Sequence, residues 1–365
     1  MNPVPSAFSA YFRTKLLQWH ERNNKRTMPW KGEKDVYKIW LSEIILQQTR
    51  VEQGTDYYLK FLTQFPTIQH LARAPLERVY KLWEGLGYYN RCKNLHHTAQ
   101  VIVKEWGGIF PDSYDALLRL KGVGPYTAAA IASFAYNHPH AVLDGNVYRV
   151  LSRFFGITEP TDTKQGEQLF RNVADACLHP KRSALYNQAI MDFGATICKP
   201  NVPNCAECPL RRKCVAYTQN LITELPVRSK QKQRRDRWFV FFSLHHQNRM
   251  AIRIREGKDI WHHLHELPHY EAATQKEWDQ FIKAEYHNWI ASHFAPGYEL
   301  LSISPVFTQP LTHQQIHAVF IRLTLKKPFL HIRKHWQWLG PAERNRLAFP
   351  KIINQFLLAH ESQRR

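Results

Sequence analysis

Apolar residues recur at helical intervals through most of residues 1–220. The residues at these positions are mainly Phe, Leu, Ile, Trp and Ala, and glycine or proline interrupts the pattern between segments. The pattern therefore predicts an almost wholly helical region without a sheet. The predicted helices cover 8–22, 40–49, about 53–64, about 75–84, about 91–105, about 164–178 and about 183–197.

From Trp238 the pattern changes to runs typical of strands. Two apolar runs, 238–246 and 249–256, flank Gln247 and Asn248, which predicts a β-hairpin. Further strands are expected over 301–332, with helices over 274–290 and 350–360. We therefore predict a helical region over 1–218, a basic linker over 219–237 and a small α+β domain over 238–365.

A glycine-rich turn lies at the centre of the helical region. It reads Leu120-Lys121-Gly122-Val123-Gly124, and Pro125 suits the first position of the helix that follows. The first N–H groups of that helix are free to bind an anion such as a phosphate. The stretch has the form of a helix-hairpin-helix motif, although an ordinary turn between two helices has a similar sequence.

The net charge of +20 over 365 residues points to a polyanionic partner. The alternatives are a membrane surface or a charge that serves only solubility, and no apolar run approaches the roughly 18 residues of a spanning helix. The first residues lack the basic and apolar segments of a secretory signal. We expect a cytoplasmic, nucleoid-associated monomer that binds double-stranded DNA.

Four of the six cysteines form a compact group with the spacing C-x6-C-x2-C-x5-C. They are Cys198, Cys205, Cys208 and Cys214. In a chain without a secretory signal this density predicts a metal site rather than disulfides. Zinc and an iron–sulfur cluster both accept four thiolates, and spacing alone leaves both open. The cations at 211–213 would bring positive charge to the same loop.

The order of these motifs resembles the endonuclease III superfamily of DNA glycosylases, and within it the MutY family. The matching segments are 29–30, 40–51, 82–96, 120–131, 143–150 and 187–198. The resemblance implies a six-helix barrel lobe over about 30–137 and a second lobe, formed by 1–29 and 138–218, that carries one [4Fe-4S] cluster. It also implies that the C-terminal part is a Nudix-like domain.

The chemistry of base removal requires two carboxyl groups with different environments. Cleavage of an N-glycosidic bond creates positive charge on the sugar, while the leaving base needs a proton. Glu43, between apolar neighbours on its helix, is the candidate acid, and burial should raise its pKa. Asp144 precedes a helix, where N–H groups should keep it ionised as the cation stabiliser. Alone, these residues read as a surface glutamate and a helix N-cap.

Tyr126 stands where lyase-competent relatives of this superfamily carry a Schiff-base lysine. Without that amine no efficient imine forms, so we expect base removal without strand cleavage. The resemblance also assigns an adenine pocket and a set of DNA contacts. The pocket residues are Arg26, Trp30, Lys31, Gln188 and Met191, and Lys31 departs from the usual arginine. The DNA contacts are Gln48, Thr49, Leu86, Tyr88, Lys121, Gly122, Val123, Gly124 and Asn146.

The C-terminal domain resembles the module that reads 8-oxoguanine opposite adenine. Thr312 and His313 stand where the family has serine and histidine, while Leu311 replaces the usual phenylalanine. No Nudix catalytic box is present in the sequence. The expected activity is removal of adenine paired with 8-oxoguanine or guanine. The alternatives are a thymine or other mismatch glycosylase, a non-catalytic lesion binder and an iron–sulfur redox protein.

Overall fold

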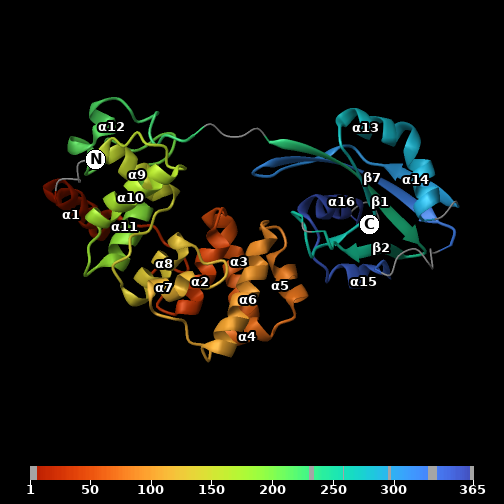
Figure 1. Cartoon of the computed structure of the whole chain (residues 1–365), viewed down its shortest axis with the longest axis horizontal. Coiled ribbons are helices and arrows are strands. Elements are labelled where there is room, and N and C mark those ends of the chain that lie inside the picture. Colours follow the sequence, from red (N-terminus) through yellow and green to blue (C-terminus); the bar gives the residue numbers. More distant parts are fainter. Residues whose placement is uncertain (1–5, 230–233, 258, 295–296, 328–334, 362–365) are drawn as a thin grey trace. The chain divides into compact units, whose positions relative to one another are not determined.

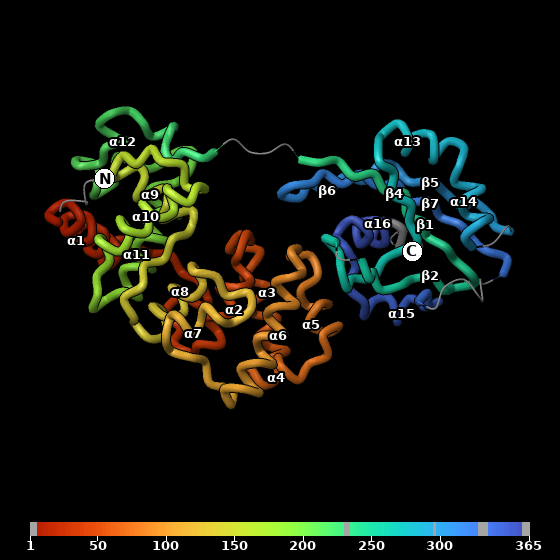
Figure 2. Tube along the Cα trace, viewed as in Figure 1, coloured from red at the N-terminus to blue at the C-terminus, as the bar shows by residue number. Residues whose placement is uncertain are grey.

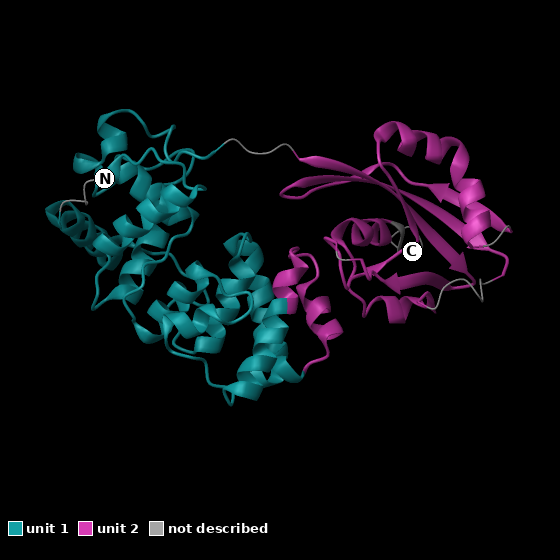
Figure 3. Ribbon diagram, viewed as in Figure 1, with its two compact units in different colours: residues 1–73, 94–231 teal, residues 74–93, 232–365 magenta. Residues whose placement is uncertain are grey.

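The computed structural model describes residues 6–229, 234–257, 259–294, 297–327 and 335–361. The chain forms two compact units (Figure 3). The first unit comprises 1–73 and 94–231, and the second comprises 74–93 and 232–365. The first of these is helical and the second contains the strands (Figure 1). None of the described helices is both long and apolar enough to cross a membrane.

The described part of the first unit consists of helices joined by loops. The elements are α1 (Ser6–Asn23), α2 (Val36–Leu46), α3 (Val51–Gln64), α4 (Ile68–Arg73), most of α6 (Tyr89–Glu105), α7 (Tyr114–Leu118), α8 (Pro125–Tyr136), α9 (Gly145–Phe155), α10 (Lys164–Cys177), α11 (Ser183–Thr196), η1 (Arg211–Lys213) and α12 (Val215–Thr218). The helical prediction is confirmed, although no helix was predicted over the short helices α4, α7 and α12.

The helix predicted over 40–49 has different ends. Asp35 caps α2 by accepting a hydrogen bond from the Tyr37 N–H, so the helix begins before Trp40. It ends at Leu46, because Gln48 adopts a φ of 55° and cannot continue a right-handed helix. The apolar stripe therefore continues one turn further towards the N-terminus than the pattern suggested.

One apolar core joins the start of the chain to its middle. Phe12 and Leu16 of α1 pack with Phe154 of α9 and Phe193 of α11, all buried. Phe8 stacks on Phe154 with ring centroids 5.0 Å apart. As a result α1 lies beside α9–α11, which are far from it in sequence (Figure 2).

The second unit is built on a mixed sheet with the strand order β3-β2-β1-β7-β5. Three further strands join it, since β4 pairs with β1, β6 with β7 and β8 with β2. The strands are β1 (Arg235–His246), β2 (Arg249–Ile254), β3 (His265–Glu266), β4 (His269–Ala272), β5 (Tyr298–Ile303), β6 (Phe307–Pro310), β7 (Gln314–Leu325) and β8 (Gln337–Leu339). The helices are α5 (Leu76–Trp83), α13 (Gln275–Gln280), η2 (Phe281–Glu285), α14 (Tyr286–His293), α15 (Pro341–Arg344) and α16 (Lys351–Glu361).

The central strand β1 is buried on both faces, which explains its continuous apolar run. Val240 and Phe242 pack against the segment containing α13, η2 and α14. On the other face, Phe241 stacks on Phe320 of β7, which stacks in turn on Phe356 of α16. The hairpin predicted between 238–246 and 249–256 is confirmed by the antiparallel pairing of β1 with β2.

The predicted linker is shorter than expected. Strand β1 begins at Arg235, because Arg235 and Asp236 already pair with Gln314 and Gln315 of β7. Residues 230–233 of that linker lie outside the described residues, as do 328–332 of the predicted strands.

Candidate active site

Helix α2 carries one buried acidic side chain, that of Glu43. Most of this helix is apolar on every side, so its residues are buried all round. Glu43 is consequently only 6% exposed. It accepts a hydrogen bond from the Tyr126 hydroxyl, which comes from the first turn of α8. Together α2 and α8 hold a carboxyl and a phenol in contact inside the protein.

The electrostatics of Glu43 favour its protonated form. The pKa of Glu43 is raised to about 7, with burial as the largest cause and the charge of Asp144 acting in the same direction. The hydrogen bond from Tyr126 works in the opposite direction. Burial also raises the pKa of the Tyr126 phenol well above its ordinary value. The predicted rise in the pKa of Glu43 is confirmed, and its cause is desolvation.

Asp144 caps the helix α9, which is the role that the sequence indicates for this residue when it is considered alone. Its Oδ1 accepts from the Val147 N–H at 2.7 Å and its Oδ2 from the Asn146 side chain at 2.7 Å. Asn146 is held in turn by Arg149, whose Nη2 lies 2.8 Å from Asn146 Oδ1. The Nε of Arg149 donates to the Cys198 carbonyl at 2.7 Å. This chain of bonds links the carboxylate to the cysteine loop.

The helix N-terminus acts on Asp144 in the predicted direction, but burial has the larger effect on its pKa. Burial is the largest cause and raises its pKa above the ordinary value, whereas the bonds from Val147 and Asn146 only partly oppose this. The N–H contacts are present as expected, but desolvation outweighs them. The two carboxyls therefore share a poorly solvated site.

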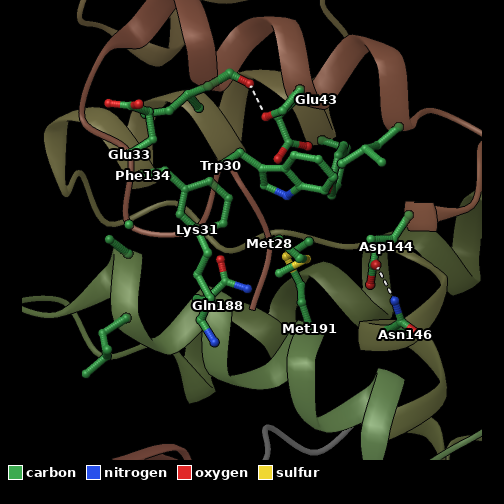
Figure 4. Close-up of a pocket in the computed structure, with 18 of the residues that line it drawn as sticks. Met28, Trp30, Lys31, Glu33, Glu43, Phe134, Asp144, Asn146, Gln188 and Met191 are labelled. Atoms are coloured by element: carbon green, nitrogen blue, oxygen red, sulfur yellow. Dashed lines mark hydrogen bonds between the residues drawn. The ribbon is translucent and has the colours of Figure 1, made fainter. Parts of the chain in front are cut away.

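Glu43, Tyr126, Asp144 and Asn146 all line one cavity of about 1030 Å³ within the first unit. Figure 4 shows Glu43 entering from α2 and Gln188 and Met191 from α11. All five residues of the predicted adenine pocket line this cavity: Arg26, Trp30, Lys31, Gln188 and Met191. Gln48 and Thr49 also line it. The size suits a flipped nucleobase with part of its sugar.

The glycine turn at 121–124 has the geometry of an exposed hairpin. Gly122 has a φ of 83°, and a Cβ at this position would lie 2.8 Å from Asn94 Cβ. Lys121 and Gly122 are exposed, Val123 is buried, and Gly124 caps α8. The turn itself is exposed, whereas Tyr126 and Thr127, which carry the first N–H groups of α8, are half-buried and buried.

Tyr88 and Leu86 have different exposures, although both were expected to enter DNA. Leu86 is 8% exposed, so its side chain packs inside the protein and is not presented as a wedge. Tyr88 is 48% exposed with a φ of 51°. Its hydroxyl is hydrogen-bonded to Thr312, while His313 is exposed beside it. Tyr88 and Thr312, which are far apart in the sequence, are therefore in contact within the second unit.

The four cysteines are free thiols within electrostatic range of one another. Burial raises the pKa of Cys208 to about 12, and the other three sulfurs contribute in the same direction. The Leu210 N–H donates to Cys208, and Arg153 Nη1 lies 3.6 Å from Cys198 Sγ. Among the described residues no group of three or more His, Cys, Asp or Glu is arranged to hold a single metal ion. An iron–sulfur cluster differs because each thiolate binds its own iron.

Asp192 was not singled out from the sequence. It is fully buried on α11 and forms ion pairs with Arg26 and Lys31 on the wall of the cavity. The available signal was a lone carboxylate in an otherwise apolar stretch, between Met191 and Phe193. A charge at such a position needs partners, and its partners were the pocket cations already named.

Comparisons with known proteins agree with this geometry. Residues 41–175 match the HhH-GPD superfamily base excision DNA repair protein family. An adenine DNA glycosylase from Buchnera aphidicola subsp. Acyrthosiphon pisum is 35% identical over 95% of this chain and 96% of its own length. The adenine DNA glycosylase of Homo sapiens is 41% identical over 56% of this chain and 39% of its own length. The chain belongs to the adenine DNA glycosylase family. It is therefore a DNA glycosylase, a hydrolase of base excision repair.

The solved structures support the fold assignment. A thermostable thymine-DNA glycosylase superposes with a TM-score of 0.54 and 28% identity, covering 58% of this chain and 98% of that structure. An endonuclease III–DNA covalent intermediate superposes with a TM-score of 0.51 at 18% identity, over 60% of this chain and 99% of that structure. The helical glycosylase fold followed by an α+β domain is confirmed. The assignment of each site residue stays a prediction.

Proposed function

We propose that this glycosylase removes adenine paired with 8-oxoguanine or guanine in duplex DNA and leaves an abasic site. The observation that carries the proposal is the pairing of two carboxyls in one cavity. Glu43 has a pKa near 7, and Asp144 is aligned by hydrogen bonds from Val147 and Asn146. Glu43 would supply a proton to the leaving base, and Asp144 would stabilise the positive charge that forms on the sugar, as glycosidic cleavage requires.

The proposed reaction begins when protonated Glu43 donates to a ring nitrogen of the flipped adenine. The bond between that base and C1′ then breaks, and its electron pair leaves with the adenine. Positive charge forms on the sugar, where the Asp144 carboxylate stabilises it. Glu43, now ionised, accepts a proton from a water that attacks C1′. The products are adenine and a hydroxyl at C1′, with Glu43 protonated again.

Tyr126 supports the proposal that the reaction stops after base removal. Its hydroxyl contacts Glu43, and burial raises its pKa well above the ordinary value. A neutral phenol does not form an imine with the abasic sugar, so strand cleavage by β-elimination has no amine at this position. The contact also influences how readily Glu43 releases its proton.

We also propose that Cys198, Cys205, Cys208 and Cys214 hold one [4Fe-4S] cluster. Four free thiols close together, with N–H groups donating to Cys208 and Cys214, fit the charge of such a cluster. When bound, the cluster would brace the loop that carries the exposed cations Arg211, Arg212 and Lys213. Purified holoprotein should contain four irons and four sulfides per chain on the basis of this cluster type, and Cys208→Ser should lose them.

Single-turnover release of adenine tests the proposed activity. The substrate is a duplex with one A:8-oxoguanine pair, and half of each sample receives alkali. Adenine release with strand breaks only after alkali is the expected result. Breaks without alkali would contradict the interpretation of Tyr126. Release of thymine from a T:G duplex, without adenine release, would favour a mismatch glycosylase. Tight duplex binding without release of any base would leave a lesion-binding protein.

A further inference from the structure

A buried carboxylate, Asp192, pairs with two residues that line the cavity. Asp192 has no exposed surface. Its Oδ1 accepts from Arg26 Nη1 at 2.9 Å, and its Oδ2 pairs with Lys31 Nζ at 2.9 Å. Asn24 Nδ2 donates to the same Oδ2 at 2.7 Å. Three donors from the segment 24–31 therefore meet one acceptor on α11.

The two cations held by Asp192 are not buried with it. The side chains of Arg26 and Lys31 are 23% and 22% exposed, and both line the cavity. A fully buried carboxylate is costly unless it is paired, so these contacts offset the cost of burying Asp192. Arg26 and Lys31 are held in position, because moving either cation would leave the buried carboxylate without one of its partners.

Lys31 is constrained more tightly than a surface lysine. Its ammonium donates to the Arg26 carbonyl at 2.6 Å as well as to Asp192. An ammonium has three hydrogens, so these contacts leave one for a group inside the cavity. Figure 4 places Lys31 beside Gln188, near Trp30. The Lys31 N–H also bonds to the Met28 carbonyl at 3.0 Å, which closes the turn carrying Trp30.

We propose that Asp192 is a positioning residue for base recognition. It holds Arg26 and Lys31 so that their remaining donors face an acceptor nitrogen of the flipped purine, and it fixes the turn that carries Trp30. The proposal rests on the assignment of this cavity as the adenine pocket. It predicts that Asp192 matters when a base occupies the cavity and not when the cavity is empty.

Two DNA duplexes distinguish a cavity occupied by a base from an empty cavity. One carries 2′-fluoro-2′-deoxyadenosine opposite 8-oxoguanine, since fluorine at C2′ disfavours the sugar cation and prevents cleavage. The other carries a tetrahydrofuran abasic analogue at the same position. For Asp192→Asn, affinity for the fluoroadenosine duplex should fall at least about tenfold, the effect of one lost charge-assisted hydrogen bond. Affinity for the abasic duplex should stay within about twofold of the original protein.

Variants at related positions complete the test. Lys31→Met should lose affinity in the same selective way, and Asp192→Asn with Lys31→Met should lose little more than either alone, because both remove one interaction. Asp175→Asn changes an exposed carboxylate of α10 that does not line the cavity, and it should alter neither affinity. If Asp192→Asn does not fold, the double variant removes both charges and gives the comparison with Lys31→Met.

Two results would overturn the proposal. Equal loss of affinity for both duplexes would mean that Asp192 only supports the fold, and unchanged affinity for both would mean that it does not position the pocket. A separate result concerns the cavity itself. If Gln188→Ala and Trp30→Ala also leave fluoroadenosine affinity unchanged, the assignment of the adenine pocket fails, whatever Asp192 does.

Discussion

At the scale of single residues, the chemistry of Glu43 follows from where its helix lies. A glutamate on a helix surface has a pKa of about 4.3 and is ionised at neutral pH. Here burial raises the pKa of Glu43 to about 7. The same desolvation that suits it for proton donation also makes its ionised form unfavourable in the folded protein.

Replacing Glu43 by glutamine should abolish adenine release and change stability in a pH-dependent way. The folded state binds a proton more tightly than the unfolded state, so stability falls as pH rises from about 4.5 to about 7. Each tenfold difference in proton affinity corresponds to about 1.4 kcal/mol, which gives a loss of about 3 kcal/mol. Glu43→Gln removes this loss. The difference in thermal midpoint, variant minus original protein, should therefore increase from pH 5 to pH 8.

The same variant checks the proposed acid. Duplex binding should persist in Glu43→Gln, because the neutral form of the side chain is retained. Adenine release at a normal rate would rule out Glu43 as the proton donor. A thermal midpoint that keeps the same offset from pH 5 to pH 8 would contradict the elevated pKa.

Replacing Tyr126 by phenylalanine should move the pH profile of adenine release. The hydrogen bond from Tyr126 lowers the pKa of Glu43, so removing it should raise that pKa above about 7. Single-turnover rates in the original protein should fall as pH rises through about 7, since the acid loses its proton. In Tyr126→Phe this decline should occur at higher pH. A decline at unchanged or lower pH would contradict the contact as described.

At the scale of elements, the hairpin at 120–124 depends on one glycine more than on the other. Gly122 has a φ of 83° and little space beside Asn94. Gly124 has a φ of −92°, and no atom lies within 4 Å of the position that a Cβ would take there. The two positions look equivalent in the sequence G-V-G. Only the backbone geometry separates them.

Replacing Gly122 by alanine should destabilise the protein by about 1–3 kcal/mol, the cost of a left-handed backbone with a side chain and a close contact. It should also weaken duplex binding, because Lys121 and Gly122 are exposed in the turn and are predicted DNA contacts. Gly124→Ala is the matched control and should cost less than about 1 kcal/mol. Denaturant unfolding of both variants measures the difference, and equal costs would contradict the role of the positive φ.

At the scale of the whole molecule, Thr312, which is predicted to read the opposite base, contacts a residue far from it in the sequence. Tyr88 and Thr312 are separated by 224 positions and are hydrogen-bonded in the second unit. Both side chains are exposed, so the contact leaves them accessible to DNA. Neither residue carries a strong signal by itself, since an exposed tyrosine and an exposed threonine are common on protein surfaces.

Replacing Thr312 by valine should reduce the preference for adenine opposite 8-oxoguanine over adenine opposite guanine by about tenfold, the effect of one hydrogen bond to a recognised base. Thr308→Val on β6 is the matched control, since Thr308 is also exposed but has no contact with Tyr88 among those described. Single-turnover rates on the two duplexes give the ratio. An unchanged ratio in Thr312→Val would remove Thr312 from lesion recognition.

Local sequence patterns were sufficient for much of this protein. Helical spacing predicted most helices of the first unit, alternating and continuous apolar runs predicted β1 and β2, and Gly122 marked the turn. These features depend on residues close together in the chain, so their physical cause is present in the sequence itself. The cysteine spacing likewise indicated a thiolate site without its cofactor.

Tertiary structure decided what those elements do together. The sequence contains no distance between Glu43 and Tyr126, and it does not show that Asp192 holds Arg26 and Lys31. It also did not show that burial raises the pKa of Asp144, because the N–H contacts are local whereas desolvation depends on every element packed around the carboxyl. Burial, ion pairing and proton affinity are properties of the folded surroundings, and for that reason only the tertiary structure determined them.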